Sequence, residues 1–177
     1  MPDVLADAHL KPFSGYDQAT AFLTEQAKRA NVLHLSYWYL QFSDGTPDQV
    51  VWVSTYDPEY MNVYMKYFTP LGDPVIETVM DDRIVDWAEW LPSGGTQAEI
   101  YEIAKNYGIT KYGLSMPLQV DGQDKIIFSV CVNSDDISWP KNRAALVQQF
   151  KPFARRFDER IRPLIVSRRK GEAVFQF

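Results

Sequence analysis

The sequence predicts an α+β fold, an α–β–α sandwich around a central antiparallel sheet of about five strands. Two observations predict it. The expected elements follow the order helix, β-hairpin, several short helices, β-hairpin and one long helix. Hairpin connections make a sheet antiparallel, and each sheet face needs apolar cover where it is not exposed to water. We therefore expect the middle helices on one face and the two terminal helices on the other.

The first helix and hairpin are predicted from capping, periodicity and turn composition. Ser14 and Asp17 resemble the two ends of a capping box, and apolar residues recur on one face as far as Ala30. Residues 32–40 and 50–55 are rich in β-branched and aromatic side chains, which favour strands. The Ser-Asp-Gly-Thr-Pro-Asp segment between them has turn composition, so the two strands should pair as a hairpin.

The middle of the chain contains three predicted helix starts. Asp57-Pro58 and Asp73-Pro74 each combine an N-cap residue with proline at the first helical position. A Thr-x-x-Glu capping box at 96–99 follows a Pro-Ser-Gly-Gly loop and opens a third helix, which should end at Gly108.

A second hairpin and a long helix complete the predicted fold. Asp121-Gly122 is typical of a tight type I′ turn and separates strands expected at 113–120 and 125–133. Pro152 should introduce a kink into the last helix. The apolar face of that helix consists of Leu146, Val147, Phe150, Phe153, Ala154, Phe157 and Ile161.

The charge of the chain is unevenly distributed. Its formal net charge is −5, but residues 141–177 carry +7 and residues 1–140 carry −12. An acidic body argues against nucleic-acid binding by the domain itself, which requires a basic surface. We interpret the basic part as a solvated helix face or linker. The length suits one domain, 1–165, followed by a linker or tail over 166–177.

The sequence contains no catalytic or metal-binding motif. Its two histidines, His9 and His34, lack partners at metal-ligand spacing, and no phosphate loop or nucleophile elbow is present. Cys131 lies in an apolar run, so we expect a buried, unreactive thiol in a reducing compartment. No apolar stretch has the length of a membrane span, and the start lacks a signal-peptide pattern. We expect a cytoplasmic protein that is no enzyme, needs no cofactor or metal and binds no membrane.

Aromatic residues recur four apart ahead of an Asp-Pro pair in the middle of the chain. The full pattern comprises Tyr56, Tyr60, Tyr64, Asp73-Pro74-Val75, Trp87, Tyr112-Gly-Leu-Ser-Met-Pro117 and Ser129. This spacing resembles the autoinducer-binding domain of LuxR-type quorum-sensing regulators. The order of helices and strands extends the resemblance over nearly the whole domain.

The pattern also has a chemical rationale of its own. Tyr60 and Tyr64 share one helix face, and a buried hydroxyl needs a partner that either the core or a polar ligand supplies. Asp73 equally suits the N-cap of its helix. An acylated amine presents two carbonyl oxygens and one N–H, so it requires donors and one acceptor inside an apolar pocket. Tyrosine hydroxyls and one aspartate meet that requirement, and both the structural and the ligand roles stay open.

The resemblance implies a role for each of these side chains. Asp73 should accept from the ligand amide N–H, as a charge-assisted bond. Tyr56 and Ser129 should donate to the acyl carbonyl. Trp87 should pack on the head group, and Gly113 should permit close strand packing.

Tyr60 departs from the family pattern. The family usually has a tryptophan there that donates to the lactone carbonyl, and a phenol donates with another reach and direction. We expect lactone recognition to survive with altered geometry, and the alternative is a ligand without a lactone. Tyr64 and Val75 complete the expected lining of the head-group region.

The first two strands bear on the size of the acyl group. If side chains alternate, Ser36, Trp38 and Leu40 share one face, as do Val50 and Trp52. Two indoles facing the pocket would shorten the acyl channel and favour a short, branched or aromatic acyl group. A register shifted by one residue would turn them to the opposite layer. The polar and indole members of this set join the candidate ligand-binding residues.

The leading functional hypothesis is a sensor domain that couples an acyl-homoserine lactone, or a related signal, to dimerisation and DNA binding. The expected partners are the small-molecule autoinducer, a second copy of the chain, and DNA only through a C-terminal domain absent from this chain. Two alternatives stay open: a PAS- or GAF-like sensor or LuxR-type protein with a non-lactone ligand, and an enzyme acting on an acylated amine or lactone. The missing nucleophile–base pair argues against the enzyme.

Overall fold

One five-stranded antiparallel sheet forms the centre of the molecule. A computed structural model describes residues 11–67, 72–90, 95–118 and 122–169. The sheet has the strand order β2-β1-β5-β4-β3, and every neighbouring pair is antiparallel, which confirms the predicted sheet. The strands are β1 (His34–Ser43), β2 (Thr46–Ser54), β3 (Val85–Asp86), β4 (Gly113–Leu118) and β5 (Lys125–Cys131).

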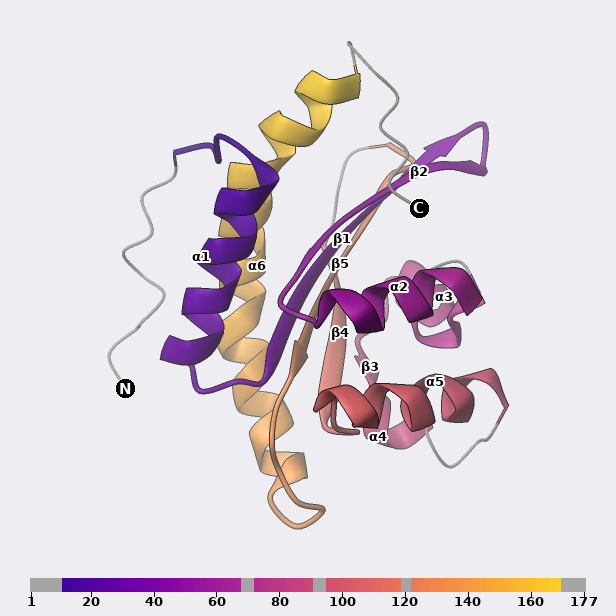
Figure 1. Cartoon of the computed structure of the whole chain (residues 1–177), viewed down its shortest axis with the longest axis vertical. Coiled ribbons are helices and arrows are strands. Elements are labelled where there is room, and N and C mark those ends of the chain that lie inside the picture. The colour runs from indigo at the N-terminus through magenta and orange to yellow at the C-terminus, as the bar shows by residue number, and fades with distance from the viewer. Residues whose placement is uncertain (1–10, 68–71, 91–94, 119–121, 170–177) are drawn as a thin grey trace.

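Helices cover both faces of this sheet, as the element order predicted. Figure 1 shows the first and last helices on one face and the four middle helices on the other. The first layer contains α1 (Tyr16–Arg29) and α6 (Trp139–Arg169). The second contains α2 (Pro58–Tyr67), α3 (Pro74–Met80), α4 (Trp87–Trp90) and α5 (Thr96–Ala104), which continues into the 3-10 turn η3 (Lys105–Tyr107).

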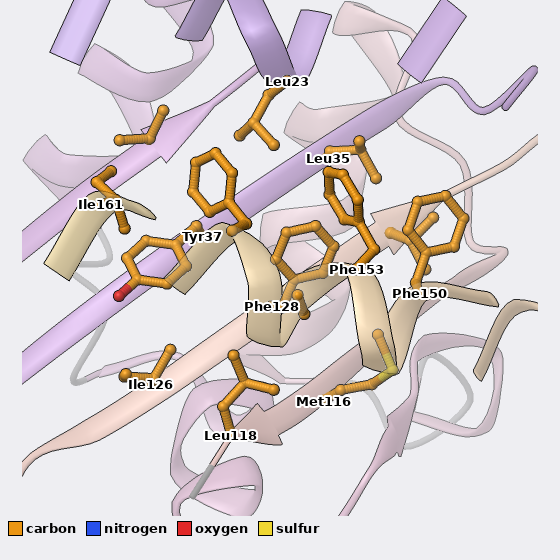
Figure 2. Packing of buried hydrophobic residues seen from close by; sticks show 14 of the residues in the cluster. Leu23, Leu35, Tyr37, Met116, Leu118, Ile126, Phe128, Phe150, Phe153 and Ile161 are labelled. Carbon is orange, nitrogen blue, oxygen red and sulfur yellow. The ribbon is translucent and has the colours of Figure 1, made fainter. Parts of the chain in front are cut away.

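An aromatic core fills the space between the sheet and the terminal helices. Phe150, Phe153 and Phe157 of α6 are almost completely buried together with Phe128 of β5 and Tyr37 of β1. Figure 2 shows four of these rings, labelled Tyr37, Phe128, Phe150 and Phe153, among aliphatic side chains of α1 and the sheet. The apolar face of the last helix is therefore covered by its own sheet, through most of its length. Such burial supplies most of the stabilising free energy of a domain.

A second apolar cluster lies between the sheet and the middle helices. Trp38 of β1 pairs with Trp52 of β2 and with Ile127 of β5, so the expected alternation and register are confirmed. Leu40 and Val50 lie on the same face as the two indoles and belong to the same cluster. This cluster surrounds the cavity described below.

Two of the predicted helix caps are wrong, because neither α1 nor α5 has a side-chain cap. No side-chain bond caps α1 at Gly15, and Ser14 instead bonds through N and Oγ to Gln18 Oε1, at 2.8 and 3.0 Å. With Gly15 at the N-cap, the third helical residue is Gln18 and not Asp17. The box at 96–99 is replaced by Gly95, whose φ of 68° starts α5 without a side-chain cap. Gly108 ends this region with a φ of 73°, as predicted.

The remaining predictions concern the second hairpin and the last helix. Asp121 lies outside the described residues, while Gly122 has the positive φ, 83°, that suits a turn. The helix α6 continues through both Pro152 and Pro163 and extends to Arg169. None of the helices described is both long and apolar enough to span a membrane.

Candidate functional site

A small cavity lies in the second apolar cluster, between the sheet and the middle helices. It holds about 80 Å³ of solvent-sized space. Nine of the ten candidate binding residues line it: Ser36, Trp38, Tyr56, Tyr60, Tyr64, Asp73, Val75, Trp87 and Ser129. The tenth, Trp52, is not among the lining residues and instead stacks behind Trp38, with ring centroids 5.9 Å apart.

Asp73 occupies the wall of the cavity just before α3. Its Oδ1 accepts the backbone N–H of Val75 at 2.8 Å, which confirms the predicted N-cap. Its Oδ2 accepts the Tyr64 hydroxyl at 2.7 Å. Only 8% of the residue is exposed, and burial raises the pKa of this carboxyl, although the bonds it accepts oppose the shift. A carboxylate oxygen can accept two hydrogen bonds, so Asp73 retains acceptor capacity for a ligand.

Three phenol rings form a row beside this carboxylate. The ring of Tyr60 lies 5.5 Å from that of Tyr56 and 6.1 Å from that of Tyr64. Burial raises the pKa of all three phenols, so they remain protonated hydrogen-bond donors at neutral pH. Within the described residues, the Tyr60 hydroxyl makes no hydrogen bond, which distinguishes it from Tyr64.

A row of serines crosses three strands beneath the cavity. Ser129 of β5 lies between Ser36 of β1 and Ser115 of β4, as direct cross-strand partners. Ser115 Oγ and Ser129 Oγ are 2.8 Å apart, and Trp87 Nε1 donates to Ser115 Oγ at 2.9 Å. Trp38 Nε1 donates to Ser36 Oγ at 3.3 Å. Ser115 was not a candidate from sequence, although it lies within the Tyr112–Pro117 motif and directly opposite a candidate serine.

Gly113 positions the indole of Trp87. A Cβ atom at this glycine would overlap the six-membered ring of Trp87. Glycine at this position therefore allows the Trp87 ring to pack directly on strand β4. The sequence analysis had expected it to allow close packing between strands. The indole can lie flat on the strand and point its N–H toward Ser115.

Helix α5 contributes a wall that the sequence analysis missed. Gln97, Ile100 and Ala104 line the cavity and are spaced three and four residues apart, so they share one helix face. The amphipathic spacing was visible, but it does not distinguish a cavity wall from ordinary core. Thr110 and Lys111 complete the rim.

The site combines polar groups of both hydrogen-bonding kinds with an apolar surround. It offers an anionic acceptor in Asp73, donors in the tyrosines and serines, and flat indole surfaces. Among the residues that the structure describes, no group of three or more His, Cys, Asp or Glu side chains is placed to hold a metal ion. The arrangement is suited to binding a small, partly polar molecule.

Comparison with protein families gives one match. The family described as "Autoinducer binding domain" matches residues 16–161. No curated protein sequence matches the chain.

Several solved structures resemble the fold. The N-acylhomoserine-lactone-dependent LuxR-family transcription factor CepR2 from Burkholderia cenocepacia is 15% identical with a TM-score of 0.66, over 93% of this chain and 92% of that chain. SdiA of Escherichia coli is 15% identical with a TM-score of 0.62, over 93% of this chain and 66% of that one. SdiA in complex with octanoyl-rac-glycerol is 13% identical with a TM-score of 0.55, over 84% of this chain and 63% of that one. At such identities the likeness establishes the fold.

Proposed function

The chain belongs to the autoinducer-binding-domain family, and from this premise we propose that its cavity binds an acyl-homoserine lactone. Family membership makes it a signal-sensing domain of the LuxR type and not an enzyme. The observation that supports the lactone is the convergence of the Asp73 carboxylate, three phenols and a serine row on one small cavity. An acylated amine needs one acceptor and several donors within apolar surroundings, and this wall provides them.

In this proposal the amide of the ligand is held from both sides. Its N–H donates to Asp73, while its carbonyl accepts from Tyr56 and Ser129. An indole N–H can only donate, so Ser115 accepts the bond from Trp87 and keeps its own proton. In this proposal Ser115 donates that proton to Ser129, whose oxygen lies 2.8 Å away. Ser129 then has its own proton free for the ligand carbonyl. Hydrogen bonds in such a chain strengthen one another.

The head group occupies the region of Tyr60 and Trp87. The Tyr60 hydroxyl, which makes no hydrogen bond within the described residues, donates to the lactone carbonyl. The indole of Trp87 packs against the lactone ring. Tyr64 contributes indirectly, because its bond to Asp73 Oδ2 holds the carboxylate in place.

The acyl group is short, branched or aromatic. The cavity holds about 80 Å³ of solvent-sized space, well below the roughly 300–1,000 Å³ of typical small-molecule sites. Trp38 closes one side, and Trp52 stacks behind it and limits its movement. A long acyl chain would require both indoles to rearrange.

The biological setting follows from the family rather than from this domain alone. The chain spans 66% of the E. coli SdiA chain. We propose that ligand binding is coupled to pairing of two copies and to DNA binding by a separate C-terminal domain, in the cytoplasm.

A second candidate ligand is an acyl compound without a lactone. SdiA has been solved in complex with octanoyl-rac-glycerol, and Tyr60 stands where the family usually has a lactone-binding tryptophan. A monoacylglycerol retains the acyl carbonyl but lacks the amide N–H. Asp73 would then accept from a glycerol hydroxyl.

Thermal denaturation of the purified protein tests the proposal. Short-chain acyl-homoserine lactones should raise the melting temperature, because a ligand that binds only the folded state stabilises it by about 2.7 kcal/mol at a hundred times its Kd. Octanoylglycerol serves as the non-lactone comparison. Mass spectrometry of small molecules extracted from the protein identifies the natural ligand. If no lactone shifts the melting temperature while the acylglycerol does, the lactone proposal is wrong.

A further inference from the structure

Gln97 presents an unpaired polar group at the wall of the cavity. The residue lies in the first turn of α5 and is 8% exposed. Its Oε1 is buried and has no hydrogen-bond partner, and within the described part of the chain its side chain makes no hydrogen bond at all. Leaving a buried acceptor unpaired costs about 1–3 kcal/mol. Buried polar groups are nearly always paired, so a partner from outside the chain would complete the hydrogen bonding of Gln97.

We propose that Gln97 is a specificity-determining residue that accepts a hydrogen bond from a hydroxyl group on the ligand. This inference rests on the proposed function. In that function Asp73 takes the amide N–H, and the two ligand carbonyls require donors rather than another acceptor. A further acceptor in the wall therefore matches a further donor on the ligand. In an acyl-homoserine lactone that donor is a hydroxyl on the acyl chain, and in a monoacylglycerol it is a hydroxyl of the head group.

Gln97 differs from another buried, unpaired amide of the domain because it lines the cavity. Gln41 of β1 also has a buried, unpaired Oε1 and is 4% exposed, but it does not line the cavity. Ile100 and Ala104 follow Gln97 on the same face of α5, and both line the cavity with it. Tyr101 also lines the cavity from this helix, so Gln97 is one of two polar side chains on the face of α5 that would meet the ligand.

The test compares the affinities of hydroxylated and unsubstituted ligands in matched variants. Calorimetry measures the Kd of a short acyl-homoserine lactone, its 3-hydroxyacyl analogue and octanoylglycerol. For the wild type, we expect the hydroxylated lactone to bind about fivefold more tightly than the unsubstituted one, the effect of one typical hydrogen bond. Gln97→Met preserves length and removes the amide, so the two lactones should then bind equally well.

Gln41→Met is the control, because it removes an equally buried amide away from the cavity and should keep the fivefold preference. If octanoylglycerol alone responds to Gln97→Met, the hydroxyl belongs to a polyol head group. An unchanged lactone ratio in Gln97→Met, with octanoylglycerol also unaffected, would overturn the role of Gln97 while lactone binding stands. If neither the lactones nor octanoylglycerol binds the wild type, the proposed function fails and this inference with it.

Discussion

Asp73 combines a structural role and a proposed ligand role on its two oxygens. Oδ1 caps α3 through Val75 N, and Oδ2 holds the Tyr64 hydroxyl. Asn is as good an N-cap as Asp, but its amide nitrogen accepts no hydrogen bond. We therefore expect Asp73→Asn to keep the cap and the fold while it weakens ligand binding about 10- to 100-fold, the effect of losing one charge-assisted bond.

The melting temperatures with and without ligand measure both effects of Asp73→Asn. Asp73→Ser is a second test variant, because serine also caps a helix but carries no charge. Both variants should fold and both should bind weakly. Wild-type affinity in either variant would show that Asp73 does not contact the ligand.

The ionisation of Asp73 makes ligand binding depend on pH. Burial raises the pKa of the folded carboxyl above its ordinary value of 3.8. The proposed bond from the ligand N–H is charge-assisted only when this carboxyl is ionised, so affinity should fall as the pH drops below the raised pKa, up to tenfold per pH unit. The stability of the ligand-free protein depends on pH in the opposite direction. Protonation of Asp73 favours the folded state, because its pKa is higher there than in the unfolded chain. This contribution is lost as the pH rises through the raised pKa. Calorimetric titration between pH 4 and 8 should show the fall in affinity, and Asp73→Asn should abolish it.

Gly113 is required because of the indole that lies on it. Gly113→Ala should force the Trp87 ring away from β4 and break its bond to Ser115, at a cost of about 1–3 kcal/mol from overpacking. We expect a lower melting temperature, an altered tryptophan fluorescence spectrum and weaker ligand binding. Gly15→Ala is the control, since a Cβ there meets nothing within 4 Å. Unchanged stability and binding in Gly113→Ala would contradict this account.

At the scale of elements, local chemistry predicted most helices and strands but not every cap. Asp57 and Asp73 cap their helices as expected, with Asp57 Oδ1 accepting from Glu59 N at 2.7 Å. The predicted caps at 14–17 and 96–99 are wrong. Ser14 bonds to Gln18 instead of capping α1, and α5 begins after Gly95, whose φ is 68°. Alternation predicted the faces of β1 and β2, although Leu35 to Gln41 of β1 are buried on both faces. A slip of one residue would exchange the side chains that face the two helix layers.

The pairing of β1 and β2 places the two indoles that limit the acyl group. Trp38 lines the cavity and Trp52 supports it from behind. Trp38→Leu should open the channel and shift the preference toward longer acyl chains, by about tenfold or more for an extra two methylene groups, each worth about 0.8 kcal/mol when buried. Affinities for lactones of four to twelve acyl carbons measure the shift.

Trp52→Leu is the matched control for Trp38→Leu. It removes an equal ring that does not line the cavity, so its shift in chain-length preference should be smaller. An equal shift in both variants would mean that Trp52 limits the channel as much as Trp38 does. An unchanged preference in Trp38→Leu would show that the acyl chain lies elsewhere.

At the scale of the whole molecule, the site is assembled from segments that only the sheet brings together. Ser36, Ser115 and Ser129 come from three strands, and their alignment depends on registers that single-strand patterns do not encode. The tyrosines and Asp73 could be predicted because they belong to one local stretch with a regular spacing. The sequence analysis missed Gln97, because only the packed structure shows that its Oε1 is buried without a hydrogen-bond partner.

Asp86 connects the two sides of the molecule at the edge of the sheet. It precedes Trp87 and accepts from Trp139 Nε1 of α6 through both oxygens at 3.0 Å, and from Arg143 Nη1 at 2.8 Å. The residue is 7% exposed, so its bonds to Trp139 are shielded from water, whereas the Arg143 side chain is 42% exposed. The cavity and the long helix α6, which pack on opposite faces, therefore share one short segment. If the ligand contacts the indole as proposed, we expect its binding to affect α6 through this segment.

Asp86→Ala should weaken both the fold and this connection. Loss of the acceptor leaves the Trp139 N–H unpaired in the core, which should lower the free energy of unfolding by about 2–3 kcal/mol. Glu89→Gln is the control, since Glu89 contacts the same arginine at 2.8 Å but is exposed, and such pairs contribute about 0–1 kcal/mol.

Hydrogen exchange provides the second readout: ligand should slow exchange at the start of α6 in the wild type and in Glu89→Gln, but much less in Asp86→Ala. Equal protection in all three proteins would show that α6 does not respond through Asp86.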